Sequence, residues 1–265
     1  MPSSYRALCS DFYINQKMSV KLDLPRGRET ILDLFERVRH TFPSMASFKR
    51  YKDELALESP TDAEPHRWLA VRSSTIRSGT VNPDTFDDGY AIHKSVLEIA
   101  PYFLSISPLD IEYVELLYGF DLAATGNQDA MVAEALLEGS PLGELLDVEN
   151  ATTIDFQPLI GMLLGGNGLD IPSGSASVTR GTDAIEAHLE IKTRSGGAAG
   201  RGGEGTGEPI SVYVTLRRYE PVTNLKAMPG VFRTLADQAE HLIEQRVLPG
   251  LIAPLRRAIM LGGGG

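Results

Sequence analysis

Residues 13–24 read YINQKMSVKLDL, and their second part alternates apolar with polar side chains. Met18, Val20, Leu22 and Leu24 take every second position, and the residues between them are polar or charged. Because successive side chains of a strand point to opposite faces of its sheet, this alternation predicts a half-buried strand. The elements that follow this strand decide which fold it belongs to.

The rest of the first half predicts two helices and three further strands. They are a helix at 31–42 ended by Pro43, strands at 48–58 and 68–76, a helix from 90 to about 104, and a strand at 111–122. The resulting order, β-α-β-β-α-β, is that of ferredoxin-like folds, in which both helices cover one face of an antiparallel sheet.

The second half predicts a different order of elements. They are short helices at 128–138 and 141–146, strands at 152–164, 175–179, 184–193 and 210–219, and a long helix from Val231 that Pro249 and Gly250 break. We therefore predict an α+β protein with a ferredoxin-like βαββαβ N-terminal half at 1–125. An antiparallel sheet with a long C-terminal helix follows at 126–265, as a second domain or as part of one continuous domain.

Composition indicates a protein of the cytoplasm. The chain has 265 residues, of which 42% are hydrophobic and 23% charged, as is usual for globular proteins. No segment has the length and apolar character of a secretory signal or a membrane span. Cys9 is the single cysteine, which rules out an internal disulfide and fits a reducing compartment. We expect no association with membranes.

The net charge of −10 is concentrated in the middle of the chain. From Ser95 to Thr179 there are thirteen Asp or Glu and no Lys, Arg or His. This region disfavours binding to nucleic acid, which requires cations against the phosphates. It is interpreted as a solvated face, as a docking surface for a basic protein, or as a calcium site, although no loop in it has the spacing of a known calcium cage.

The docking interpretation names particular residues. The candidate residues are Asp110, Glu112, Glu115, Asp121, Glu134 and Glu138, with Arg256 and Arg257 in the C-terminal tail. If the basic tail of one copy meets the acidic region of another, the protein forms a homo-oligomer.

Sequence motifs for catalysis or metal binding are missing. The serines lie in no G-x-S-x-G elbow, and the five histidines are scattered without a zinc-type spacing. Glu186 and His188 share a strand face and would supply at most two ligands to a metal. Asp84, Asp87 and Asp88 are expected to cap the next helix. We predict no cofactor and no metal, which favours a protein that is not an enzyme.

A glycine-rich stretch, SGGAAGRGGEGTGEP at 195–209, contains the G-x-G-x-x-G spacing of dinucleotide-binding loops at Gly200, Gly202 and Gly205. That fingerprint must open a helix, but the segment that follows, ISVYVTLRRY, is a strand pattern. We predict a hairpin loop with weak order at 195–208 and no nucleotide.

Three segments together resemble a sporadically distributed family of uncharacterised bacterial proteins. They are His40-Thr41-Phe42-Pro43 at the end of the first helix, the strand LDIEYVELLYGF and the helix LADQAEHLIEQRVLPGL. The resemblance implies a bacterial α+β protein of the cytoplasm, without an established activity.

Two functions follow from these observations. The first is a non-catalytic protein-interaction or scaffold protein that docks partners on its acidic middle region. The alternative is a binder or enzyme for a small apolar molecule, held in a cavity between the C-terminal sheet and the helix at 231–248.

Overall fold

The structure is a computed structural model that describes residues 5–25, 27–164, 184–193, 208–219 and 222–262. Nine strands are present in these residues: β1 (Asp11–Val20), β2 (Ser47–Tyr51), β3 (Glu54–Glu58), β4 (His66–Val71), β5 (Thr75–Val81), β6 (Ile111–Leu122), β7 (Leu159–Leu164), β8 (Ile185–Lys192) and β9 (Ile210–Tyr219). The helical segments are α2 (Arg28–Thr41), α3 (Phe86–Phe103), η1 (Pro108–Asp110), α4 (Gln128–Leu137), α5 (Pro141–Glu144), η2 (Leu225–Ala227), α6 (Met228–Leu242), η3 (Ile243–Ile252) and α7 (Ala253–Gly262).

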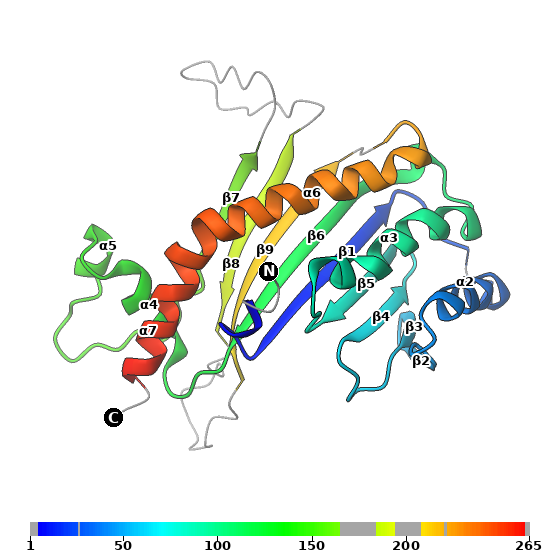
Figure 1. Ribbon diagram of the computed structural model, residues 1–265. Helices are drawn as coiled ribbons and strands as arrows, with labels where there is room; N and C mark the ends of the chain where they lie inside the picture. The colour runs from blue at the N-terminus through cyan, green and yellow to red at the C-terminus, as the bar shows by residue number, and fades with distance from the viewer. Residues whose placement is uncertain (1–4, 26, 165–183, 194–207, 220–221, 263–265) are drawn as a thin grey trace, which may run out of the picture.

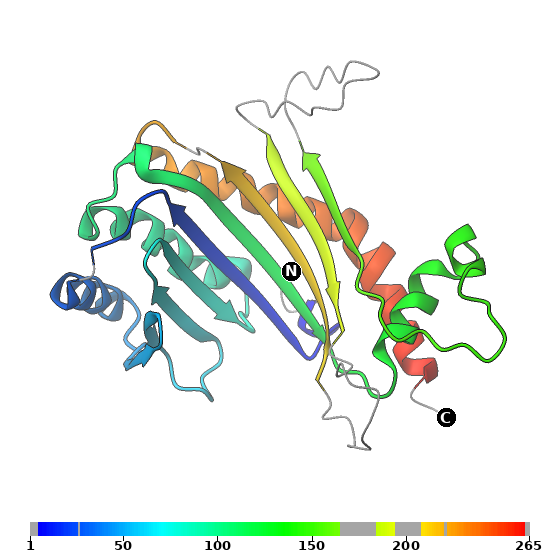
Figure 2. The same cartoon turned by 180° about the vertical axis from the view of Figure 1, so that it is seen from behind.

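All nine strands form one antiparallel sheet in the order β2-β3-β4-β5-β1-β6-β9-β8-β7. Helices α3 and α6 lie across one face of this sheet, and the described residues place no helix over the other face (Figures 1 and 2). The prediction of an α+β protein with an antiparallel sheet and a long C-terminal helix is confirmed. Strand β6 belongs to the predicted first half of the chain and β9 to the second, and the two pair from Tyr113–Tyr219 to Leu122–Ile210. One sheet therefore contains strands from both sides of the predicted boundary between residues 125 and 126.

Two strand predictions in the first half were wrong in the same way. The segment 48–58 is a hairpin, because the chain turns at Lys52 and Asp53 between β2 and β3. The segment 68–76 is also two paired strands, β4 and β5, joined by a turn at residues 72–74. Neither turn contains glycine or proline, the strongest sequence signals for a turn; only Asp53, Ser73 and Ser74 are residues that turns favour.

In the second half, β9 has the predicted bounds, and β8 differs from its prediction by one residue at each end. The strand predicted at 152–164 is shorter, since only Leu159–Leu164 pairs with β8. The strand predicted at 175–179 and residues 195–207 of the predicted loop lie outside the described residues.

The predicted break of the C-terminal helix at Pro249 and Gly250 was also wrong. Helix α6 continues through η3 and α7 without interruption (Figure 1). Segment η3 is a π-helix, in which hydrogen bonds join residues five apart. This wider turn accommodates the ring of Pro249, which in an α-helix would clash with the carbonyl four residues earlier.

The core fills the space between the covered face of the sheet and its helices. Alternate residues of the central strands point into it, as the alternation of apolar residues predicts. Fully buried members include Phe12, Ile14, Met18, Leu116, Tyr118, Phe120, Val212, Val214, Ile92, Val96 and Leu235. Because β6 and β9 supply this core together with β1, the two halves of the chain share it.

On the uncovered face, two glycines lie under aromatic rings. A Cβ atom on Gly79 would be 2.1 Å from Nε1 of Trp68, its partner on β4, and one on Gly119 would be 2.1 Å from the ring of Tyr13. The absence of a side chain therefore lets each ring lie flat on the neighbouring strand and shield it from water.

We expect Gly79→Ala to lower the free energy of unfolding by about 1–3 kcal/mol, because the added methyl group displaces the indole of Trp68. Urea denaturation measures the change. In a Trp68→Ala background the same substitution should cost much less, since the ring is gone. An equal cost in both backgrounds would mean that the ring contact is not the cause.

Candidate functional site

The structure gives four of the predicted docking carboxylates partners inside the molecule. The bonds run from the Ser107 amide to Asp110 (2.8 Å), from Ser19 Oγ to Glu112 (3.0 Å), from Arg217 Nε to Glu115 (2.9 Å) and from Ser211 Oγ to Asp121 (2.7 Å). A carboxylate that already accepts hydrogen bonds has less capacity left for a partner. These four residues, in β6 or just before it, therefore contribute to the sheet itself.

The other predicted residues lie at one end of the molecule. Glu134 and Glu138 are exposed on or just after α4, and Arg256 and Arg257 belong to α7, which packs against α4 (Figure 1). The predicted residues thus divide into a group at β6, in the middle of the sheet, and a group at this end. They do not form one surface.

Beside the second group, the chain projects from the fold. Residues 138–158, here called the arm, connect α4 to β7 and extend beyond the sheet (Figure 1). Apolar side chains of the arm are 43% to 81% exposed: Leu142, Leu145, Leu146, Val148 and Ile154. The arm also carries five carboxylates and no Lys, Arg or His. Exposed apolar side chains gathered in this way mark interaction surfaces.

The end of the arm is fixed to the fold by α4. Asp129, which is 2% exposed, accepts hydrogen bonds from the Phe156 amide (3.0 Å) and from Thr193 Oγ1 (2.6 Å). Asn127 Nδ2 donates to the Thr153 carbonyl at 2.8 Å. Of the thirteen carboxylates, Asp129 thus has a structural role, because it ties the arm to α4 and β8.

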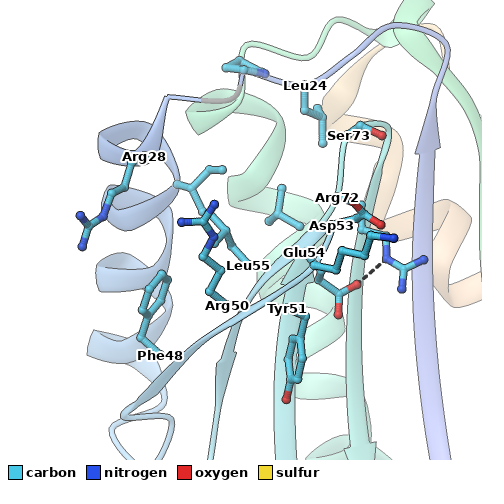
Figure 3. Close-up of a pocket in the computed structure, with 14 residues that line it drawn as sticks. Leu24, Arg28, Phe48, Arg50, Tyr51, Asp53, Glu54, Leu55, Arg72 and Ser73 are labelled. Atoms are coloured by element: carbon cyan, nitrogen blue, oxygen red, sulfur yellow. Dashed lines mark hydrogen bonds and ion pairs between the residues drawn. The ribbon is translucent and has the colours of Figure 1, made fainter.

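At the opposite end of the sheet, a groove of about 700 Å³ opens between α2 and the β2–β3 hairpin (Figure 3). Its walls come from α2, the hairpin, and the segments after β1 and β4. The lining residues are Leu24, Pro25, Arg28, Ile31, Phe48, Arg50, Tyr51, Lys52, Asp53, Glu54, Leu55, Val71, Arg72 and Ser73. Its apolar members Leu24, Ile31 and Val71 are buried, whereas Phe48 and Tyr51 remain 42% and 47% exposed.

The groove has an excess of positive charge. Arg72 Nε is paired with Glu54 at 2.7 Å (Figure 3). In the described part of the chain, the exposed cations Arg28, Arg50 and Lys52 have no carboxylate within ion-pair distance. Charged groups without a local partner are available to a ligand or a protein of opposite charge.

A row of charged side chains with alternating signs crosses the uncovered face of the sheet. Across β1, β6, β9 and β8 the strand register aligns Lys17, Glu115, Arg217 and Glu186, whose charges alternate in sign. Arg217 also lies over the ring of Tyr113, 4.5 Å from its centroid. A row that neutralises itself favours a solvated surface over a docking site for a charged partner.

Two groups with reactive chemistry are buried or held in their neutral form. His93 Nδ1 is 2.8 Å from Ser78 Oγ, but both side chains are 0% exposed. Burial lowers the pKa of His93 to about 3, so its imidazole is neutral. Burial likewise raises the pKa of the Cys9 thiol to about 12, which keeps the thiol protonated at neutral pH.

Other predicted features can be placed as well. The cap of α3 is Thr85, whose Oγ1 accepts from the Asp88 amide at 3.1 Å, while Asp87 and Asp88 lie in the first helical turn. His188 Nε2 is 3.5 Å from Glu186, and the described residues contain no group of three or more side chains that could hold a metal. Among the described helices, none is both long and apolar enough to cross a membrane.

The helix at 231–248 was predicted to cover an apolar cavity, and the structure shows how its first part, α6, packs on the sheet. The residues of α6 that face the sheet are buried: Val231, Phe232, Leu235, Ala236 and Ala239. A hollow of about 440 Å³ in the described structure lies elsewhere, where Leu8 meets η3 and α7. Packing of α6 on β6 and β9 therefore offers no support for a ligand beneath this helix.

Sequence reasoning missed the groove. Its three unpaired cations come from α2 and from the hairpin, which are distant in sequence, and the hairpin itself was read as one strand. The run Lys49-Arg50-Tyr51-Lys52 is the signal that could have drawn attention to this end. No protein-family model matches the chain, and no curated protein matches it in sequence.

Proposed function

We propose that this protein acts by binding another protein through its arm, and not by catalysis. The observation that carries the proposal is the exposure of five large apolar side chains in a segment that bears five carboxylates and no cation. Such a surface fits a partner with an apolar patch and basic residues around it. We also propose that this binding takes place in the cytoplasm, and the single cysteine supports a reducing compartment.

Two further observations support binding over catalysis. The Ser78–His93 pair and the Cys9 thiol lack the access or the ionisation that a nucleophile needs. In addition, Asp129 anchors the arm, so the arm presents its side chains from a fixed base. A surface that is already ordered loses less conformational entropy when it binds.

We further propose that the first half is a ferredoxin-like unit with an inserted hairpin. Strands β4, β5, β1 and β6 are neighbours in that order, with α2 before β4 and α3 before β6, which supports this interpretation. The insertion is β2–β3, and it extends the sheet beyond β4. The same insertion supplies one wall of the groove.

We expect the double variant Leu142→Ser, Leu145→Ser to lose its protein partners. These side chains are 60% and 71% exposed, so the variant should fold normally while its apolar contact area falls. Wild-type and variant proteins, each immobilised and exposed to a lysate of the source cells, are compared by quantitative mass spectrometry. Retention of the specific partners should fall about tenfold or more, as for central interface residues.

The matched control is Leu109→Ser, because Leu109 is 84% exposed and belongs to η1, away from the arm. This control should retain the same partners as the wild type. If the arm variant retains them as well, or if nothing is retained by the wild type, the proposed function fails.

A further inference from the structure

We propose that the groove between α2 and the β2–β3 hairpin is the docking site for the arm of a second copy of this chain. The protein would then assemble head to tail, with each copy giving its arm to one neighbour and its groove to another. This inference rests on the proposed function of the arm, and it names the partner.

The charges of the two surfaces are complementary. The arm contributes Glu138, Glu144, Asp147, Glu149 and Asp155 without any cation. The groove contributes Arg28, Arg50 and Lys52, which have no carboxylate within ion-pair distance in the described structure. Acidic and basic patches of this kind select their partner by charge and align it as it approaches.

The apolar parts of the two surfaces match as well. Apolar side chains line the groove, and two rings among its lining residues, Phe48 and Tyr51, are half-exposed. Its volume of about 700 Å³ accommodates several side chains, and the arm offers a row of leucines around α5. Association would remove apolar surface from water on both sides, which is the main driving force for assembly.

The geometry of the fold forces the contact to be between copies. The arm leads into β7 and the groove is built on β2, and these strands are at opposite ends of the nine-stranded sheet (Figures 1 and 2). The arm therefore cannot reach the groove of its own chain.

Head-to-tail contacts use two different surfaces, and this makes the proposal testable by charge reversal. One variant reverses the arm (Glu144→Lys, Asp147→Lys), and the other reverses the groove (Arg50→Glu, Lys52→Glu). All four side chains are exposed, so both variants should fold, which circular dichroism verifies. Sedimentation velocity then measures the mass distribution of each protein over a range of concentrations.

We expect the wild type to form dimers and larger species as its concentration rises, with weaker association at high salt. Each variant alone should associate at least about tenfold more weakly, because the two reversed charges meet groups of their own sign across the contact. An equimolar mixture of the two variants should again form dimers, since the unchanged arm of the groove variant meets the unchanged groove of the arm variant.

A wild type that stays monomeric at every concentration would overturn the proposal, as would a mixture that stays monomeric or variants that associate like the wild type. The outcome is separable from that of the proposed function. If the wild type is monomeric but retains a lysate partner that Leu142→Ser, Leu145→Ser loses, the arm binds a different protein and the function stands. If the wild type is monomeric and Leu142→Ser, Leu145→Ser retains the same lysate partners as the wild type, both proposals fail.

Discussion

Replacing Phe120 with alanine should lower the free energy of unfolding by about 3–5 kcal/mol. Phe120 is 0% exposed near the C-terminal end of β6, with its ring centroid 5.1 Å from that of Phe12 and 5.7 Å from that of Tyr5. Removing the ring leaves a cavity between residues that the sheet holds in place. Because β6 joins β1 to β9, the loss should affect both halves of the molecule.

Urea denaturation followed by two probes checks this result. Fluorescence of Trp68, the only tryptophan, reports on β4 in the first half, and far-ultraviolet circular dichroism reports on the whole chain. Both midpoints should shift together. Tyr102→Ala is the control, since Tyr102 is 63% exposed and should change stability by about 0.5 kcal/mol or less. Separate transitions, of which only one moves, would contradict a shared core.

Acid should destabilise the protein through His93. Its pKa is lowered from 6.5 to about 3 by burial, against a backbone hydrogen bond with Ile14 that raises it. Below pH 6.5 His93 therefore becomes protonated in the unfolded chain, whereas in the folded state it stays neutral down to about pH 3. The free energy of unfolding should fall by about 1.4 kcal/mol for each pH unit between about 6 and 4 on account of this residue.

The measurement is the free energy of unfolding as a function of pH for the wild type, His93→Leu and His241→Leu. His93→Leu should be less stable at pH 7, because it loses the bond to Ser78, but its curve should be flatter between pH 6 and 4. His241 is exposed, so its variant should keep the slope of the wild type. Equal slopes in all three proteins would show that His93 takes up its proton without unfolding.

The sequence predicted some elements closely because their patterns are local. Strand β9 was predicted with its correct bounds, since Val212, Val214 and Leu216 alternate without interruption. The hairpin β2–β3 was missed because the turn at Lys52 and Asp53 has no residue that demands a turn conformation. The helix continues past Pro249 because a π-helical segment accommodates the proline, and no local pattern announced that change.

The candidate site was harder to predict because its residues meet through strand register. Glu115 was expected to face a partner, but the pairing of β6 with β9 places it against Arg217, 102 residues further along the chain. Similarly, the groove depends on a hairpin that adds to the edge of the sheet. Charge along the sequence indicated an acidic region, but only the fold divides it into carboxylates that are hydrogen-bonded at β6 and an exposed arm.

The unbroken run of α6, η3 and α7 has a mechanical consequence. One end of this helix packs on β6 and β9, and the other end packs against α4, at the base of the arm (Figure 1). We therefore expect a force applied to the arm to be transmitted through α4 to this continuous helix, and along the helix to the centre of the sheet.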